Sequence, residues 1–139
     1  MEFAALVVTL YETVAGREIA IDRSIAFSDT TDINVHKAAT IGVVMGVGNN
    51  RFDPNAQLTR EQAAVMLVRL AAAIGQPFPP SVPTFTDNAQ VSSWAVEAVG
   101  QMQASGIMGG VGNNMFDPLG AYTREQSIVT ILRLFNTLD

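Results

Sequence analysis

An internal repeat constrains the fold of this chain more than any other feature of its sequence. The segment VGNNRFDP at residues 47–54 recurs as VGNNMFDP at residues 111–118, and TREQ at 59–62 recurs at 123–126. The offset between the copies is 64 residues in both cases. Because the two motifs keep their spacing, the chain contains two copies of one structural unit, and such units bury a core by packing against each other.

A shorter motif opens each unit, and a partial third copy stands at the front of the chain. Phe-Ser-Asp at 27–29 recurs as Phe-Thr-Asp at 85–87 with an offset of 58, so the first full unit is six residues shorter. Residues 2–10 align with residues 62–70. We therefore divide the chain into the closing helix of a partial first repeat at 1–16, a shortened second repeat at 27–75, a Pro-rich linker at 76–84 and a third repeat at 85–139.

The pattern within each unit predicts helices and almost no strand. Thr59 with Gln62, and Thr123 with Gln126, have the Thr-x-x-Gln pattern of a capping box. Gly75 stands where a C-cap glycine is expected. Apolar residues follow each box at helical spacing, at Ala63, Leu67, Leu70 and Ile74 and again at Ile128, Ile131, Leu132, Phe135 and Leu138. With shorter helices expected near 35–41 and 94–105, the fold class is all-α, with about five helices and Gly-rich loops.

Charge and composition exclude several classes of function. The 139 residues include eight Lys and Arg against thirteen Asp and Glu, so the basic face that nucleic acid requires is missing. No apolar run reaches the roughly 18 residues of a membrane span, so we predict no membrane insertion. The absence of cysteine excludes thiol chemistry. The opening MEFAALVVTLYE is typical of an amphipathic helix and not of a signal peptide, and we expect the chain to be a piece of a longer protein.

Motifs for catalysis or metal binding are missing. The sequence has no Gly-x-Ser-x-Gly, P-loop or His-Glu-x-x-His motif. The single histidine, His36, is expected at the surface or at a helix end. The Asn- and Asp-rich loops lack the alternating oxygen ligands and final Glu of an EF-hand. We therefore predict that the chain is not an enzyme and has no catalytic residues, no metal site and no cofactor.

In order, the motifs of this chain resemble the repeat of the S-layer homology (SLH) family. That repeat has Phe-x-Asp, a Trp-Ala helix, Gly-Ile-x-x-Gly, a Gly-rich loop ending in Phe-x-Pro, and a closing Thr-Arg-x-Glu or Thr-Arg-Glu helix. The third repeat matches it at Phe85, Asp87, Trp94-Ala95, Gly106-Ile107, Gly110, Gly112, Phe116, Pro118 and Thr123-Arg124-Glu125. The second repeat has no Trp and matches at Phe27, Asp29, Gly42, Gly46, Gly48, Phe52, Pro54 and Thr59-Arg60-Glu61.

The resemblance implies a non-catalytic anchoring module at the bacterial cell surface, in the cell wall or S-layer. Its repeats would pack as a pseudo-threefold SLH-type bundle and bind secondary cell-wall polysaccharide, which in the better-known members carries a pyruvylated sugar held between repeats. A second hypothesis comes from the residues themselves. The first helix has an apolar stripe without its usual neighbour, which a homodimer would cover; the stripe consists of Phe3, Leu6, Val7, Leu10 and Val14.

Each candidate ligand-binding side chain has a structural alternative. Arg60 and Arg124 stand in the first turn of a helix, where they either bind a ligand carboxylate or pair with an Asp of the opening motif. Asp29 and Asp87 are the acidic residues of those motifs and are themselves candidates. Trp94 either stacks on a sugar ring or anchors its helix to the core.

The glycines of the loops are candidates for a different reason. Gly46 and Gly110 are groove candidates by the family resemblance, and Gly48 and Gly112 would let a sugar approach the backbone closely. The amide side chains of the Asn pairs at 49–50 and 113–114 either bind sugar hydroxyl groups or serve the turn, and we favour the turn because Asn tolerates left-handed backbone. Phenylalanines that recur beside the turns are predicted to lie in the core: Phe27, Phe52, Phe85 and Phe116.

Overall fold

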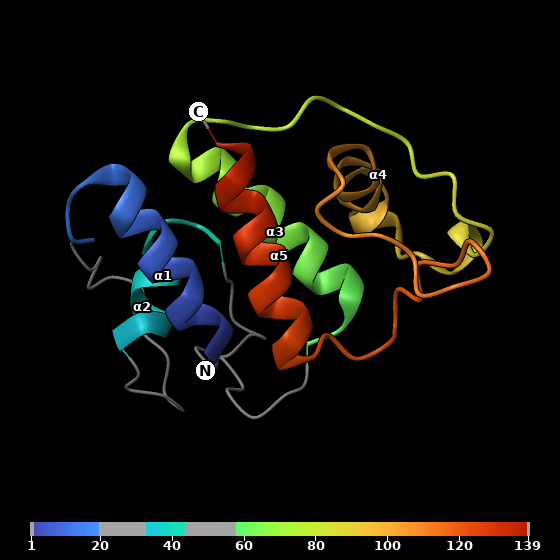
Figure 1. Cartoon of the computed structure of the whole chain (residues 1–139), viewed down its shortest axis with the longest axis horizontal. Coiled ribbons are helices and arrows are strands. Elements are labelled where there is room, and N and C mark those ends of the chain that lie inside the picture. The colour runs from blue at the N-terminus through green and yellow to red at the C-terminus, as the bar shows by residue number, and fades with distance from the viewer. Residues whose placement is uncertain (1, 20–32, 44–57, 139) are drawn as a thin grey trace.

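A computed structural model of the chain places helices around a common core (Figure 1). It describes residues 2–19, 33–43 and 58–138. Within these ranges the α-helices are α1 (Glu2–Ala15), α2 (Ile33–Thr40), α3 (Arg60–Ile74), α4 (Val96–Ser105) and α5 (Arg124–Thr137), and the 3-10 helices are η1 (Asn88–Gln90) and η2 (Ser93–Ala95). The same ranges contain isolated β-bridges and no strand. The all-α prediction is confirmed.

The three long helices form the centre, and each short helix packs on the long helix that precedes it. Helices α1, α3 and α5 contact one another, α2 packs on α1, and α4 packs on α3 (Figure 1). Val7, Leu67, Leu134, Val35 and Met102, one from each helix, are fully buried in a single apolar cluster. Burial of such a side chain stabilises the fold by about 1.5 to 3 kcal/mol. No helix in the described part of the chain is long and apolar enough to span a membrane.

Local sequence explains the ends of α3. The side chain of Thr59 accepts a hydrogen bond from the Gln62 backbone N–H, and the Gln62 side chain accepts one from the Thr59 N–H, so the predicted capping box is complete. At the other end Gly75 adopts a left-handed conformation with φ of 92°, and its N–H donates to the carbonyls of Ala71 and Ala72. Both predictions for this helix are confirmed.

The capping box predicted for α5 is only half formed. Thr123 accepts from the backbone N–H of Gln126, as expected. The Gln126 side chain, however, accepts from Arg60 Nη1 at 2.6 Å and donates to the Ala121 carbonyl at 3.4 Å. The prediction of a complete box is wrong here, because a residue of the second repeat occupies the amide oxygen that would close it.

The apolar stripes of α3 and α5 also differ. Ala63, Leu67 and Leu70 are buried as predicted, and Ile74 packs against the core. On α5, Ile131 is buried and Leu138 half-buried, but three of the predicted residues are exposed: Ile128 by 48%, Leu132 by 57% and Phe135 by 45%. Helical spacing of apolar residues therefore does not indicate burial at these three positions. The physical reason is that α4 packs beside α3, whereas the main packing partners of α5 in the described ranges are α1 and α3.

The apolar stripe of α1 is covered by the chain itself. Phe3, Val7 and Leu10 are buried, Leu6 is half-buried, and only Val14 is exposed, by 37%. The covering elements are α2, α3 and α5, and the ring of Phe3 meets that of Tyr122 edge to face at 5.4 Å. The premise that this stripe lacks a neighbour is wrong.

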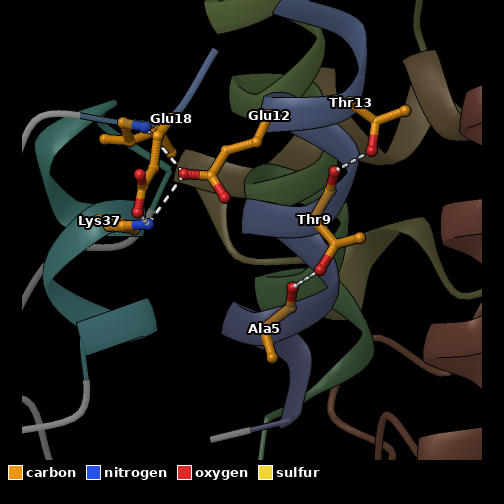
Figure 2. Close-up of polar contacts among 7 residues, drawn as sticks. Ala5, Thr9, Glu12, Thr13, Glu18 and Lys37 are labelled. Carbon is orange, nitrogen blue, oxygen red and sulfur yellow. Dashed lines mark hydrogen bonds and ion pairs between the residues drawn. The ribbon is translucent and has the colours of Figure 1, made fainter. Parts of the chain in front are cut away.

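A partly buried ion pair joins α1 to α2 (Figure 2). Lys37 Nζ lies 2.9 Å from Glu12 Oε2 and 3.2 Å from Glu18 Oε1, and Glu12 also accepts from the Ile19 N–H at 2.8 Å. The bonds from Ile19 and Lys37 lower the pKa of Glu12, and the bond to Glu12 raises the pKa of Lys37. Sequence analysis did not find this pair. Along α1, each of Thr9 and Thr13 donates its hydroxyl to the carbonyl four residues earlier (Figure 2).

The Pro-rich segment at 76–84 lies against α4. The side chain of Gln101 donates to the carbonyls of Phe78 and Pro79. A Cβ at Gly100 would stand 2.3 Å from the Ser81 carbonyl oxygen, so only glycine permits this close approach. The segment therefore connects α3 to the third repeat while packing against that repeat.

Candidate functional site

The opening motif of the third repeat holds its Gly-rich loop in place. Asp87 is 5% exposed, and its two carboxylate oxygens accept from the N–H groups of Phe116 at 2.9 Å and Asp117 at 2.8 Å. The rings of Phe85 and Phe116 are buried with centroids 5.2 Å apart, which confirms the core prediction for both. The Phe-x-Asp and Phe-Asp-Pro motifs therefore form one structural unit.

Backbone geometry explains the residues of the loop itself. Gly112 has φ of 128°, and Asn113 and Asn114 are left-handed at 53° and 56°, so turn chemistry accounts for the Asn pair. At Gly110 a Cβ would lie 2.7 Å from the Met115 carbonyl oxygen. That same oxygen accepts from the Val111 N–H at 2.8 Å, so a side chain at Gly110 would disrupt the hydrogen bond that closes the loop.

Arg60 is buried and donates to the third repeat through three nitrogens. It is 6% exposed. Nε donates to the Phe116 carbonyl at 2.8 Å, Nη1 to Gln126 Oε1 at 2.6 Å and Nη2 to the Gly109 carbonyl at 2.6 Å. The guanidinium also stands 4.7 Å from the centroid of the Phe116 ring. Burial lowers the pKa of Arg60, and the negative charge of Asp117 opposes this effect.

The neighbouring Glu61 makes a second link between the repeats. It is 2% exposed and accepts from the Ser92 N–H at 2.9 Å, just before η2. The backbone N–H groups of Arg60 and Glu61 donate to the carbonyls of Gly120 and Pro118. In the second repeat, the Thr-Arg-Glu motif is thus an interface between repeats, which the sequence interpretation did not predict.

The other predicted residues are placed differently. Arg124, in the first turn of α5, is exposed where its counterpart Arg60 is buried. Trp94 lies in η2 and is 60% exposed, so the core alternative for it is wrong. Asp29, Gly46 and Gly48 lie outside the described residues, as do Phe27 and Phe52.

A hollow of about 420 Å³ lies between the Gly-Ile-x-x-Gly segment and α5. We call it the α5 groove. Its lining consists of Arg60, residues 107–110, and Glu125, Gln126, Val129, Thr130 and Arg133. Of the predicted site residues it brings together Arg60 and Gly110, while Asp87, Trp94, Gly112 and Arg124 are outside its lining. The volume is within the usual range for a small-molecule site.

Sequence reasoning missed Arg133, which lines the groove from the far end of α5. It is exposed, and its Nη1 donates to the Ile107 carbonyl at 3.3 Å. Arg69 stands 64 residues before it, at the equivalent position of the preceding repeat. The recurrence of arginine at this position is the signal in the sequence that could have identified Arg133. Glu125 and Gln126 were noticed only as parts of the closing motif.

The α5 groove is locally basic on an acidic chain. Arg60 and Arg133 contribute two positive charges against one negative charge from Glu125, whereas the chain has a net charge of −5. The described residues contain no group of three or more His, Asp or Glu side chains that could hold a metal ion. The groove can therefore offer guanidinium donors, a carboxylate acceptor and a neutral amide to a polar ligand.

Comparison with known proteins agrees with the repeat. The S-layer homology domain matches residues 27–64 and 84–126. The chain belongs to the S-layer homology domain family. Both matched segments include a Gly-rich loop and the start of a closing helix, and Arg60 joins the first segment to the second. SLH domains are non-catalytic modules that anchor proteins at the bacterial cell surface, which is where this SLH chain is located.

Two SLH-containing relatives are large proteins. An endoglucanase of Bacillus sp. (strain KSM-635) is 32% identical over 102 residues, which cover 72% of this chain and 11% of the relative. An amylopullulanase of Thermoanaerobacterium thermosulfurigenes is 30% identical over 102 residues, covering 72% of this chain and 5% of the relative. This SLH chain thus spans a small fraction of the length of the relatives it matches.

Proposed function

We propose that this SLH chain anchors a longer protein to the bacterial wall by binding secondary cell-wall polysaccharide in the α5 groove. The observation that carries the proposal is the composition of that groove. Arg60 of the second repeat, the Gly-Ile-x-x-Gly segment and the polar side of α5 meet around one hollow. A saccharide with hydroxyl groups and an acidic substituent matches these donors and acceptors.

The groove supports binding and not hydrolysis. A glycosidase acts with two carboxylates about 5 to 9.5 Å apart across the scissile bond. Glu125 is the one carboxylate in the lining of the α5 groove. Asp87, the nearby acidic residue of the opening motif, already accepts two backbone hydrogen bonds. The chemistry of the relatives therefore belongs to other parts of those proteins, and this chain has an anchoring role.

The arrangement of the long helices supports a pseudo-threefold bundle. We propose that α1, α3 and α5 are the closing helices of three SLH repeats, with repeat boundaries at 1–16, 27–75 and 85–139 and the Pro-rich linker at 76–84. The three helices contact one another, and α2 packs on α1 while α4 packs on α3. The contacts of Arg60 and Glu61 then form the boundary between the second and third repeats.

Co-sedimentation tests the proposed function. The purified chain is mixed with native cell-wall sacculi and, in parallel, with sacculi stripped of their secondary polymer. Binding in the α5 groove predicts that the chain pellets with native sacculi and stays in solution with stripped ones. A folded chain that stays in solution with both rejects the proposal.

A second candidate function is self-association. The predicted surface, the stripe of α1, is buried, but an apolar furrow of about 240 Å³ lies between α1 and α5 and is lined by Leu6, Leu10, Ile128, Leu132 and Phe135 among others. We propose a homodimer through this furrow as the alternative. Light scattering at increasing concentration tests it, with Leu132→Ser as the variant expected to remain monomeric. A wild-type chain that is monomeric at high concentration rejects the dimer.

A further inference from the structure

The long helices α1, α3 and α5 run in the same direction, so their carboxyl ends lie toward one end of the bundle (Figure 1). The aligned peptide dipoles of a helix place about half a negative elementary charge at its carboxyl end. In the described chain, none of these three helices has a basic residue in its last turn. This end of the bundle is therefore negative, and it lies away from the first turns of α3 and α5 that line the α5 groove.

A pocket of about 340 Å³ lies between the ends of α1 and α3. We call it the carboxyl-end pocket, and its lining consists of Tyr11, Val14, Ala15, Arg17, Ala73 and Ile74. Most of these residues belong to the last turns of the two helices, where carbonyl groups have no N–H partner within the helix. The N–H groups just beyond the helices bond to the carbonyls of Glu12, Ala71 and Ala72, and none of these three residues lines the pocket. The pocket therefore suits a ligand group that donates hydrogen bonds and carries a positive charge.

The side chains of the pocket add a positive charge and an apolar wall. Arg17 is exposed just beyond the end of α1 and brings a guanidinium to the lining. A guanidinium binds a carboxylate through parallel N–H groups. Val14 of α1 and Ile74 of α3 supply apolar surface from two facing helices. The pocket thus combines a place for an ammonium group, a partner for a carboxylate and a surface for an aliphatic side chain.

We propose that the carboxyl-end pocket binds the zwitterion of an aliphatic α-amino acid. Its ammonium group donates to carbonyls at the ends of α1 and α3, its carboxylate accepts from Arg17, and its side chain packs on Val14 and Ile74. A simple anion is disfavoured by the negative helix ends, and a simple cation is disfavoured by Arg17. A ligand with both charges side by side satisfies both parts of the pocket. This inference goes beyond the proposed function and does not depend on the α5 groove.

The test compares three probes, valine, valinamide and N-acetylvaline, each titrated into the isotope-labelled whole chain and followed by NMR. Valine should shift the amide signals of the residues that line the pocket. N-acetylation removes the ammonium group, so the Kd should rise about three- to thirtyfold through the lost interaction with two helix ends. Amidation removes the carboxylate, so the Kd should rise about two- to fivefold, as for an exposed ion pair.

Three variants assign these preferences to the pocket. Arg17→Gln should remove the preference for valine over valinamide and keep the preference over N-acetylvaline. Ala73→Met, which extends a half-buried side chain of the lining, should abolish valine binding by filling the pocket. Arg69→Gln is the matched control for Arg17→Gln, because it removes an exposed arginine of α3 that is outside the lining. It should change neither preference.

The outcomes also separate this inference from the proposed function. Equal Kd values for valine and N-acetylvaline overturn the inference, and so does a folded Ala73→Met chain that binds valine like the wild type. If Ala73→Met does not fold, Arg17→Gln decides, and an unchanged preference over valinamide overturns the inference. A chain that pellets with native sacculi and does not bind valine overturns the inference alone. A chain that binds valine as expected and does not pellet rejects the proposed function alone.

Discussion

Nη2 of Arg60 lies 2.6 Å from the carbonyl oxygen of Gly109, a residue 49 positions later in the chain. The bond joins the first turn of one closing helix to the Gly-Ile-x-x-Gly segment of the next repeat. Because the same guanidinium also holds Phe116 and Gln126, one side chain contacts three separate parts of the third repeat. The first prediction concerns its removal.

Arg60→Gln should destabilise the chain by about 2 to 4 kcal/mol, because it leaves the buried Phe116 carbonyl and the Gly109 carbonyl without their charged donor. Urea unfolding followed by circular dichroism measures the change. Arg69→Gln is the matched control, since it removes an exposed arginine from the same helix, and it should cost no more than about 0.5 kcal/mol. Equal losses in the two variants would contradict the assigned role of Arg60.

Asp87→Asn should destabilise the third repeat by about 1.5 to 3 kcal/mol. The two carboxylate oxygens accept from Phe116 and Asp117, and an amide would direct an N–H group at one of these donors. Glu97→Gln, which neutralises an exposed carboxylate on α4, is the control for charge alone. If both variants have the same unfolding temperature, the two hydrogen bonds to the backbone do not stabilise the fold beyond the effect of the charge.

Gly110→Ala and Gly109→Ala form a pair of neighbouring substitutions with opposite expectations. A Cβ at Gly110 would meet the Met115 carbonyl oxygen at 2.7 Å, whereas one at Gly109 would have nothing within 4 Å. We expect Gly110→Ala to cost about 1 to 3 kcal/mol through the forced backbone shift, and Gly109→Ala to leave stability nearly unchanged. A tolerated Gly110→Ala in a denaturant series would show that the loop closes in another way.

The Glu12–Lys37 pair should make stability depend on pH at both ends of the scale. Glu12 has a pKa lowered from 4.5, so its contribution is present above that value and is lost as pH falls through the lowered pKa. Lys37 has a pKa raised from 10.5, so its contribution is present below that value and is lost as pH rises through the raised pKa. The difference in unfolding free energy between wild type and Lys37→Met should therefore be constant near neutral pH and shrink at both extremes. A difference that does not change with pH would exclude the pair as its source.

The sequence predicted helices better than contacts. The reason is that helix ends depend on neighbouring residues, whereas the contacts join residues that are far apart in the chain. The ends of α3 depend on Thr59, Gln62 and Gly75, which act within one turn of the helix, so the capping pattern is sufficient. The role of Arg60 depends on partners 49 to 66 residues away that become neighbours only after folding. The repeat led to a wrong prediction of a complete capping box for α5, because Gln126 is equivalent to Gln62 in sequence but lies in a different environment.

The same limit applies to the groove. Arg60 and Gly110 were predicted from motifs and both line it, but Arg133 was missed because it stands outside the motif and inside a helix. Its environment is determined by the Gly-Ile-x-x-Gly segment, which approaches α5 from an earlier part of the repeat. A second arginine at the same repeat position, Arg69, is a signal of the kind that an inspection of motifs alone overlooks.

The convergence of three bonds on Arg60 has a mechanical consequence for a surface anchor. Its partners, Gly109, Phe116 and Gln126, belong to two loop segments and one helix of the third repeat. A force that moves α3 away from that repeat stretches all three bonds together, so no bond breaks before the others. An anchor held in this way withstands small, repeated forces and separates abruptly once the guanidinium is pulled out of its site.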